Sequence, residues 1–321
     1  SWPGFRGPNL NGISPENVRL AASWPPGGPR KLWSVRLGRG HAGAAISNGR
    51  VYVLDYDEGA GADTLRCLSL DSGKEIWKQA YPVPLKYNHG LSRTVPAVSG
   101  NYVVSLGPRG HALCCKADSG EVVWKKDLVA EYGLQVPSWY FSQCPLVDGN
   151  RVIIATGGKA LMIGVDLASG SVAWTCPNPG GWEATYASIT PMNLGGTKAY
   201  VYPTTQGVVA VSTSGKLLWK FDGWKVSTAN CPSPVNCGDG RIFVSGGYNA
   251  GSMMIKATAS SASEAFALPQ RTFGSHQHTP ILYQNHLFGI NIANRQFTCL
   301  DLNGRPVWSS GHTAQFGLGP Y

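Results

Sequence analysis

The sequence has few charged residues and no long apolar run. Charged residues make up 14% of the 321 residues, and no apolar run approaches the roughly 18 residues that a membrane-spanning helix needs. The net charge is +9, yet the longest basic run is the pair Lys125 and Lys126, so no nucleic acid is expected as a partner. The eight cysteines have no paired CxxC spacing, which argues against a zinc site. Spread positive charge favours solubility or contact with acidic envelope polymers.

Glycine and proline are abundant, and one short stretch recurs. The sequence has 41 glycines and 22 prolines, and glycine turns separate short apolar runs, which is typical of an all-β protein. In five copies a glycine stands four residues ahead of a tryptophan, as in SLDSGKEIW (69–77) and KADSGEVVW (116–124). A decayed copy (252–268) has Phe266 near the expected tryptophan, and a half-copy (28–33) ends at Trp33. The period is about 46 residues.

Each repeat predicts four antiparallel strands. In the unit from residue 91 they are expected at 91–100, 101–109, 110–120 and 121–128, joined by turns rich in glycine, aspartate and serine. One such sheet cannot bury both faces alone, so the sheets must stack, and radial stacking gives a β-propeller. A large aromatic at one fixed place per blade can fill the wedge between neighbouring sheets. The tryptophans expected at these blade joints are Trp33, Trp77, Trp124, Trp174, Trp219 and Trp308.

The turn glycine followed by tryptophan resembles the tryptophan-docking motif of the PQQ-like, or quinoprotein alcohol dehydrogenase-like, β-propeller repeat family. The resemblance covers residues 29–321. The opening SWPGFRGPNLNGIS is also similar to the WPxFRGP entry of exported planctomycete and verrucomicrobial members. No signal peptide is visible, as in a mature exported chain, so we expect a periplasmic or cell-envelope location. The family includes dehydrogenases and propellers without a cofactor, so the fold alone does not give the function.

Propeller geometry predicts where a ligand would bind. Loops that join the outermost strand of one blade to the innermost strand of the next converge on one mouth of the central channel, and such a concave, polar mouth is the default binding site. Alternatively, these residues satisfy the loop backbone and line a water-filled channel. The candidates are His41, His89, Arg93, Trp139, Tyr140, Glu183, Tyr186, Asn230, His276 and His278, with Trp182 beside them.

The resemblance implies what a dehydrogenase would need at this mouth. The family's enzymes hold calcium with a Glu, an Asn and usually an Asp, stack an aromatic ring on the quinone and use an Asp as the base. Glu183 and Asn230 could supply two calcium ligands, and Trp139 or Trp182 could stack, but no mouth loop contains an Asp. We therefore expect a non-catalytic binding or scaffold module without a cofactor, with a protein or envelope polymer as partner. The alternative is a PQQ- and calcium-dependent alcohol or sugar dehydrogenase.

Three further features could carry chemistry. Cys114 and Cys115 are adjacent, as in a disulfide that some dehydrogenases of this family carry, but strand alternation points their side chains to opposite faces and favours packing. Cys231 and Cys237 could form a disulfide in an oxidising compartment. The stretch SHQHT could place the histidines at 276 and 278 on one face of a strand, which is compatible with a transition metal.

The ends of the repeat array predict an incomplete ring. Residues 1–28 are rich in proline and glycine and are expected to form an extended arm. Residues 30–37 are expected to form an outermost strand whose three inner partners are missing from the sequence before it. We therefore predict six complete blades within 29–321, and seven or eight in an intact protein that uses a further C-terminal stretch to close the ring.

Overall fold

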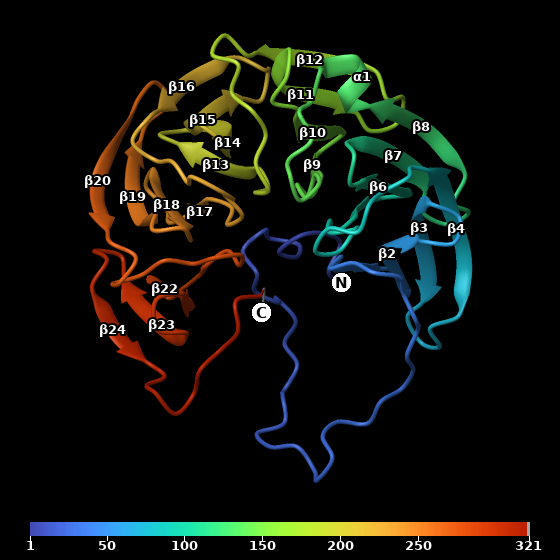
Figure 1. Cartoon of the computed structure of the whole chain (residues 1–321), viewed down its shortest axis with the longest axis horizontal. Coiled ribbons are helices and arrows are strands. Elements are labelled where there is room, and N and C mark those ends of the chain that lie inside the picture. The colour runs from blue at the N-terminus through green and yellow to red at the C-terminus, as the bar shows by residue number, and fades with distance from the viewer. Residues whose placement is uncertain (320–321) are drawn as a thin grey trace.

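The computed structural model describes residues 1–319, in which six four-stranded antiparallel sheets stand around a central axis (Figure 1). This confirms the predicted β-propeller of four-stranded blades. Blade 1 holds β1 (Ala44–Ser47), β2 (Arg50–Asp57), β3 (Ala62–Ser69) and β4 (Glu75–Pro82). Blade 2 holds β5 (Ala97–Ser99), β6 (Tyr102–Leu106), β7 (His111–Lys116) and β8 (Val122–Asp127). Blade 3 holds β9 (Leu146–Asp148), β10 (Arg151–Ala155), β11 (Ala160–Asp166) and β12 (Val172–Pro177).

The other three blades repeat this order from the inside of the ring to the outside. Blade 4 holds β13 (Thr190–Leu194), β14 (Thr197–Thr204), β15 (Gly207–Ser212) and β16 (Leu217–Phe221). Blade 5 holds β17 (Val235–Asn236), β18 (Arg241–Gly246), β19 (Gly251–Ala257) and β20 (Ala262–Leu268). Blade 6 holds β21 (Ile281–Tyr283), β22 (His286–Asn291), β23 (Gln296–Asp301) and β24 (Pro306–Ser309).

One short helix, α1 (Leu128–Tyr132), follows β8 and was not expected from the sequence. The Asp127 side chain accepts hydrogen bonds from the backbone amides of Val129 and Ala130 in α1, and Gly133 ends the helix in the left-handed conformation. No helix among the described residues is long and apolar enough to cross a membrane.

The core lies between the blades rather than within one. One buried cluster joins Val104 and Leu106 of blade 2 to Val152 and Ile154 of blade 3, and similar clusters lie between the other neighbouring blades. Apolar side chains on both faces of each sheet therefore require neighbours on both sides. The adjacent cysteines follow this rule, because Cys114 packs toward blade 3 and its neighbour packs toward blade 1. All eight cysteines are free thiols.

Each repeated tryptophan before Trp308 lies against the following blade, at or near its turn between the third and fourth strands. A side chain at the turn glycine would collide with the preceding indole, as Gly120 would with Trp77 and Gly170 with Trp124. The Trp124 indole N–H also donates to the Leu167 carbonyl oxygen at 2.9 Å. The decayed copy keeps the arrangement, since Phe266 lies against the turn glycine of blade 6. The repeated stretch therefore sits where two blades meet.

The segment 30–37 is not a strand, which corrects the expectation for it. A strand needs a ladder partner, and no described strand pairs with this segment in a sheet. Its side chains nevertheless pack on blade 1, where the Trp33 indole N–H donates to the Leu70 carbonyl oxygen at 2.7 Å and Val35 contacts the outer apolar cluster. The further blades predicted from the sequence stay a prediction.

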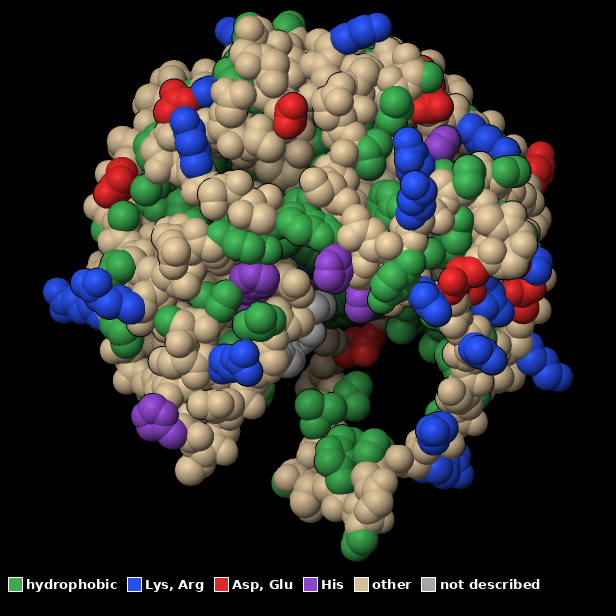
Figure 2. Space-filling model, in the orientation of Figure 1, with side chains coloured by type: hydrophobic (Ala, Val, Ile, Leu, Met, Phe, Trp, Pro, Cys, Tyr) green, Lys and Arg blue, Asp and Glu red, His purple; other side chains and the backbone are tan. Residues whose placement is uncertain are grey.

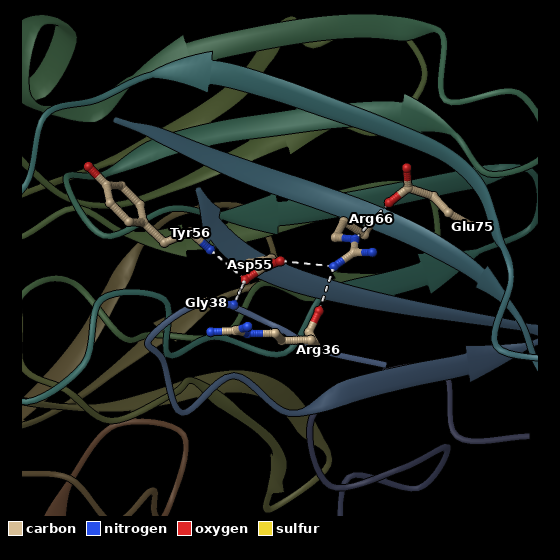
Figure 3. A network of polar contacts seen from close by, with 6 residues as sticks. All are labelled: Arg36, Gly38, Asp55, Tyr56, Arg66 and Glu75. Carbon is tan, nitrogen blue, oxygen red and sulfur yellow. Dashed lines mark hydrogen bonds and ion pairs between the residues drawn. The ribbon is translucent and has the colours of Figure 1, made fainter. Parts of the chain in front are cut away.

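A polar network fastens this incoming segment to blade 1 (Figure 3). The Arg66 guanidinium donates to the Arg36 carbonyl oxygen at 3.2 Å and to the carboxylates of Asp55 at 3.0 Å and Glu75 at 2.7 Å. The Asp55 carboxylate also accepts from the Gly38 amide at 2.6 Å. Because Arg66 and Asp55 are largely buried, these charge-assisted hydrogen bonds fix where the N-terminal segment enters the ring.

Residues 1–13 form turns inside the ring and contact the inner strands of several blades (Figure 1). Trp2 pairs with Ile46 of β1, and the Pro3 carbonyl oxygen accepts from the Val98 amide of β5. On the opposite side of the open ring, the Arg6 guanidinium donates to the carbonyl oxygens of Thr279 at 3.1 Å and Pro280 at 3.2 Å. The WPGFRGP stretch therefore connects blades 1 and 2 with blade 6.

Candidate functional site

Histidine side chains gather around the hollow at the centre of one face of the molecule (Figure 2). The residues that meet there come from loops far apart in the sequence. The Trp139 amide donates to the Tyr186 hydroxyl at 3.2 Å, and the two rings lie 5.9 Å apart. The His89 ring lies 6.5 Å from the Trp139 ring. The Tyr186 amide donates to the Asn230 carbonyl oxygen at 3.1 Å, so three successive mouth loops are connected.

Arg93 supplies a positive charge at this mouth. Its guanidinium donates to the carbonyl oxygens of Asn88, His89 and Gly90, at 2.8 to 3.0 Å, which holds the tight loop around it. Burial lowers the pKa of Arg93, and the nearby Tyr186 hydroxyl opposes that shift. Its Nε atom is buried without a hydrogen-bond partner among residues 1–319. A partly desolvated guanidinium with a spare donor favours an anionic or carbonyl-bearing ligand.

Partly or fully buried polar side chains also lie on the other side of the mouth. The His276 ring lies 4.8 Å from the Tyr248 ring, and burial lowers the pKa of His276, which favours the neutral imidazole. The Asn230 side chain is 4% exposed, and neither its oxygen nor its nitrogen has a hydrogen-bond partner among residues 1–319. Unpaired buried amides are costly, so this part of the mouth is stabilised when a polar group or water reaches it.

Two mouth candidates hold loops in place. The Tyr140 hydroxyl donates to the Lys86 carbonyl oxygen at 2.6 Å, and the Tyr140 backbone has the left-handed φ of 67°. His41 is exposed and lies against Gly90, where a side chain would collide with its ring. Both residues therefore shape the loop around Arg93.

Three predicted residues do not join these contacts. The His278 Nε2 accepts from the Ile290 amide of β22 at 2.8 Å, and burial lowers the pKa of His278 to about 4. Residues 275–278 are not a strand, so the arrangement that SHQHT suggested, with both histidines on one face of a strand, does not form. Trp182 is buried in the cluster between blades 3 and 4, and the Lys220 ammonium lies 4.8 Å from its ring. Glu183 is exposed, and its backbone pairs with Thr205 of blade 4.

The structure adds two residues that the sequence did not indicate. Tyr248 belongs to the turn between β18 and β19, and Cys231 follows Asn230 in its loop. Burial raises the pKa of Cys231 to about 12, and the Arg93 charge acts in the opposite direction. Turns between the second and third strands of a blade reach the same face as the mouth loops, so this geometry could have pointed to Tyr248.

A buried carboxylate supports the loop that carries Arg93. Asp63 is 0% exposed and accepts from the Tyr81 hydroxyl at 2.6 Å and from the Ser92 hydroxyl at 2.8 Å. Gly107 of blade 2 leaves the space that this contact needs. Burial raises the pKa of Asp63 to about 6, and the hydrogen bonds from Tyr81 and Ser92 oppose the rise. Because it is fully buried, Asp63 positions the loop and does not reach a ligand in the mouth.

Asp63→Asn is expected to flatten the pH dependence of stability. The folded pKa of about 6 lies above the ordinary 3.8, so the folded state binds this proton more tightly. The resulting stabilisation is complete below pH 3.8 and is lost as the pH rises through 6, with a ceiling of about 3 kcal/mol. Urea unfolding from pH 4 to pH 8 should therefore show a weaker decline for the variant than for the unchanged protein. If the free energy of unfolding declines equally with pH in both proteins, protonation of Asp63 does not cause the decline.

Comparisons with known proteins place the chain in a family. A model of the PQQ_2 family, described as outer membrane protein assembly factor BamB, matches residues 61–310. No protein among curated sequences matches the chain. The BamB structure from Moraxella catarrhalis has a TM-score of 0.61 and 13% identity, over 86% of this chain and 75% of that one.

Two dehydrogenase structures share the fold to a similar extent. A europium-containing methanol dehydrogenase has a TM-score of 0.58 and 12% identity, over 88% of this chain and 70% of that one. A quinohemoprotein alcohol dehydrogenase from Pseudomonas putida has the same TM-score and identity, over 88% of this chain and 60% of that one. Identities this low show the fold alone. The match over residues 61–310 shows more: the chain belongs to the PQQ_2 family of BamB-like β-propellers.

Proposed function

We propose that this chain is a non-catalytic binding module of the cell envelope, whose ligand is a segment of a protein bound at the channel mouth. The observation that carries the proposal is the set of unpaired polar groups there. Arg93, Asn230 and His276 each present a buried polar atom without a partner among residues 1–319, and aromatic rings surround them. Such a mouth can bind peptide carbonyl and carboxylate groups.

The alternative, a PQQ- and calcium-dependent dehydrogenase, fits these residues poorly. Calcium needs six to eight oxygen ligands with carboxylates among them. Glu183 is exposed, its carboxylate makes no hydrogen bond or ion pair within residues 1–319, and these residues contain no cluster of three acidic, histidine or cysteine side chains that could hold a metal. Asp63 is too deeply buried to act as the base.

The two functions are separated by titrating the protein with PQQ and calcium and then assaying dye-linked oxidation of alcohols and sugars. We expect no turnover and no calcium-dependent shift in the absorption of the added quinone. Turnover that requires both PQQ and calcium, and that Glu183→Gln abolishes while the exposed Glu264→Gln retains it, would establish the dehydrogenase instead.

The blade contacts support a scaffold role. We propose that the repeated tryptophans hold the ring together by docking on the turn of the next blade, because the same contact recurs from Trp33 to Phe266. A rigid ring of this kind presents its mouth loops with fixed spacing, which lowers the entropy cost of binding. A family description that names an outer membrane assembly factor supports a location in the envelope.

A further inference from the structure

A cavity lies between blades 1 and 2, two complete blades that are neighbours in the ring (Figure 1). At one end of their joint the Trp77 indole lies against Gly120, and its N–H donates to the Ala117 carbonyl oxygen at 3.1 Å. At the other end the joint stays open as a cavity of about 230 Å³. Its lining includes the apolar side chains Tyr81, Pro82 and Leu113 and the polar side chains His111, Lys125 and Asp127.

The polar groups of this cavity depart from the repeat. His111 of β7 pairs with Asp127 of β8, which stands three residues after the repeated tryptophan. The pairs at the same register in the neighbouring blades are Thr64 with Ala80 and Ala160 with Pro177. Of these three blades, blade 2 alone has two ionisable side chains at this place. Positions where one copy departs from the pattern of its repeat are expected to be functional.

His111 and Asp127 leave room for a group between them. The His111 Nε2 and the nearer Asp127 carboxylate oxygen are 3.8 Å apart, which is too far for a direct hydrogen bond. The other carboxylate oxygen accepts from the Val129 and Ala130 amides at 3.0 Å, so it is already occupied. A hydroxyl group between the two side chains can accept from the imidazole N–H, with the hydrogen on Nε2, and donate to the carboxylate. The two side chains are 31% and 46% exposed, so a ligand can reach them.

An aromatic ring forms the wall beside His111. The Tyr81 ring lies 5.1 Å from the imidazole. The Tyr81 hydroxyl donates to the buried Asp63 carboxylate at 2.6 Å, which holds the ring in place before any ligand binds. A sugar ring has apolar C–H groups as well as hydroxyl groups, so it matches a wall that combines an aromatic ring with hydroxyl-binding side chains.

Two exposed cations flank the cavity. Lys125 lies opposite Leu113 in the ladder between β7 and β8, and Arg109 lies in the turn before β7. Neither makes an ion pair among residues 1–319, whereas the Lys126 ammonium lies 3.5 Å from the Glu131 carboxylate. Unpaired cations beside a hydroxyl-binding pair favour a sugar that carries a carboxylate.

We propose that the cavity between blades 1 and 2 binds an acidic sugar unit of a polysaccharide. One hydroxyl group of the sugar bridges His111 and Asp127, the sugar ring packs beside Tyr81, and the sugar carboxylate pairs with Lys125. The cavity is separate from the mouth, so the proposal does not depend on the function proposed for the mouth.

Titration with trigalacturonic acid, followed by the side-chain 15N resonances of the histidines, tests the proposal. We expect a Kd of about 1 mM or tighter, with the largest shift at His111. Maltotriose, which has hydroxyl groups but no carboxylate, should bind about threefold more weakly or worse. The peptide triglutamate, which has carboxylates but no hydroxyl group, should bind about tenfold more weakly. An equal Kd for either of these two probes would overturn the proposal, because the site would then not recognise both groups.

Three protein variants locate the site. Lys125→Gln should weaken binding of trigalacturonic acid about threefold or more, because the sugar loses its cation. Lys216→Gln, at an exposed lysine of blade 4 without an ion pair among residues 1–319, should leave the Kd unchanged. Arg93→Ala, at the mouth, should also leave it unchanged. Equal Kd values for Lys125→Gln and the unchanged protein, or shifts at His89 of the mouth in place of His111, would overturn the proposal.

Discussion

Trp124→Ala is expected to lower the free energy of unfolding by about 3 to 5 kcal/mol, as truncation of a buried aromatic does. Trp124 is 8% exposed and packs in the apolar cluster between blades 2 and 3, and the substitution also removes its hydrogen bond to Leu167. Urea unfolding followed by far-ultraviolet circular dichroism measures the loss. Trp174→Ala should cost about 3 kcal/mol, because the Trp174 indole N–H has no hydrogen bond to lose among residues 1–319.

The matched control for these variants is Trp308→Ala, which removes the same side chain from the same place in a repeat. Because Trp308 is 46% exposed and has no following blade among the described residues, its loss should cost less than about 1 kcal/mol. Equal losses for Trp124→Ala and Trp308→Ala would show that docking on the next blade does not stabilise the ring.

Arg6→Met should lower the free energy of unfolding by about 3 to 5 kcal/mol. The Arg6 guanidinium donates to four carbonyl oxygens, two in its own turn, Leu10 and Asn11, and two before blade 6. Burial lowers its pKa to about 10, which remains far above neutral pH, so the group is charged when it makes these bonds. Removing it leaves carbonyl groups unpaired on both sides of the ring opening. Urea unfolding measures the loss, and limited proteolysis of residues 14–29 reports loosening of the N-terminal segment.

Arg19→Met is the matched control, because Arg19 is exposed on the same N-terminal segment and makes no ion pair within residues 1–319. It should change stability by less than about 0.5 kcal/mol. A loss below about 1 kcal/mol for Arg6→Met would mean that residues 1–13 rest in the ring without holding blade 6.

The blades could be predicted because the glycine and tryptophan that mark each blade lie close together in the sequence and recur with a regular period. The glycine and tryptophan of each copy lie four residues apart, and their periodic recurrence revealed even the decayed copy, where Phe266 occupies the expected place. The contact of Arg6 with blade 6 was not predictable, because nothing in WPGFRGP indicates carbonyl partners about 270 residues away.

The mouth could be predicted only in part. Loop order assigned Trp139, Tyr186 and Asn230 to successive mouth loops, and Tyr186 hydrogen-bonds to the backbone of the other two, since consecutive blades bring consecutive loops together. The direction of a single loop side chain depends on tertiary contacts instead. His278 turns into blade 6 because the Ile290 amide needs an acceptor, and Trp182 is buried because its ring fills a space between two blades.

We propose that this module binds a protein segment at the mouth, and this is tested in cells. The most direct measurement puts a photo-crosslinking amino acid at Trp139 in cells that make the protein, with Val172 on the outer rim as the control position. We predict a discrete protein adduct from position 139, lost when Arg93→Ala is added, and none from position 172. No adduct at 139, or equal adducts at both positions, would contradict the claim.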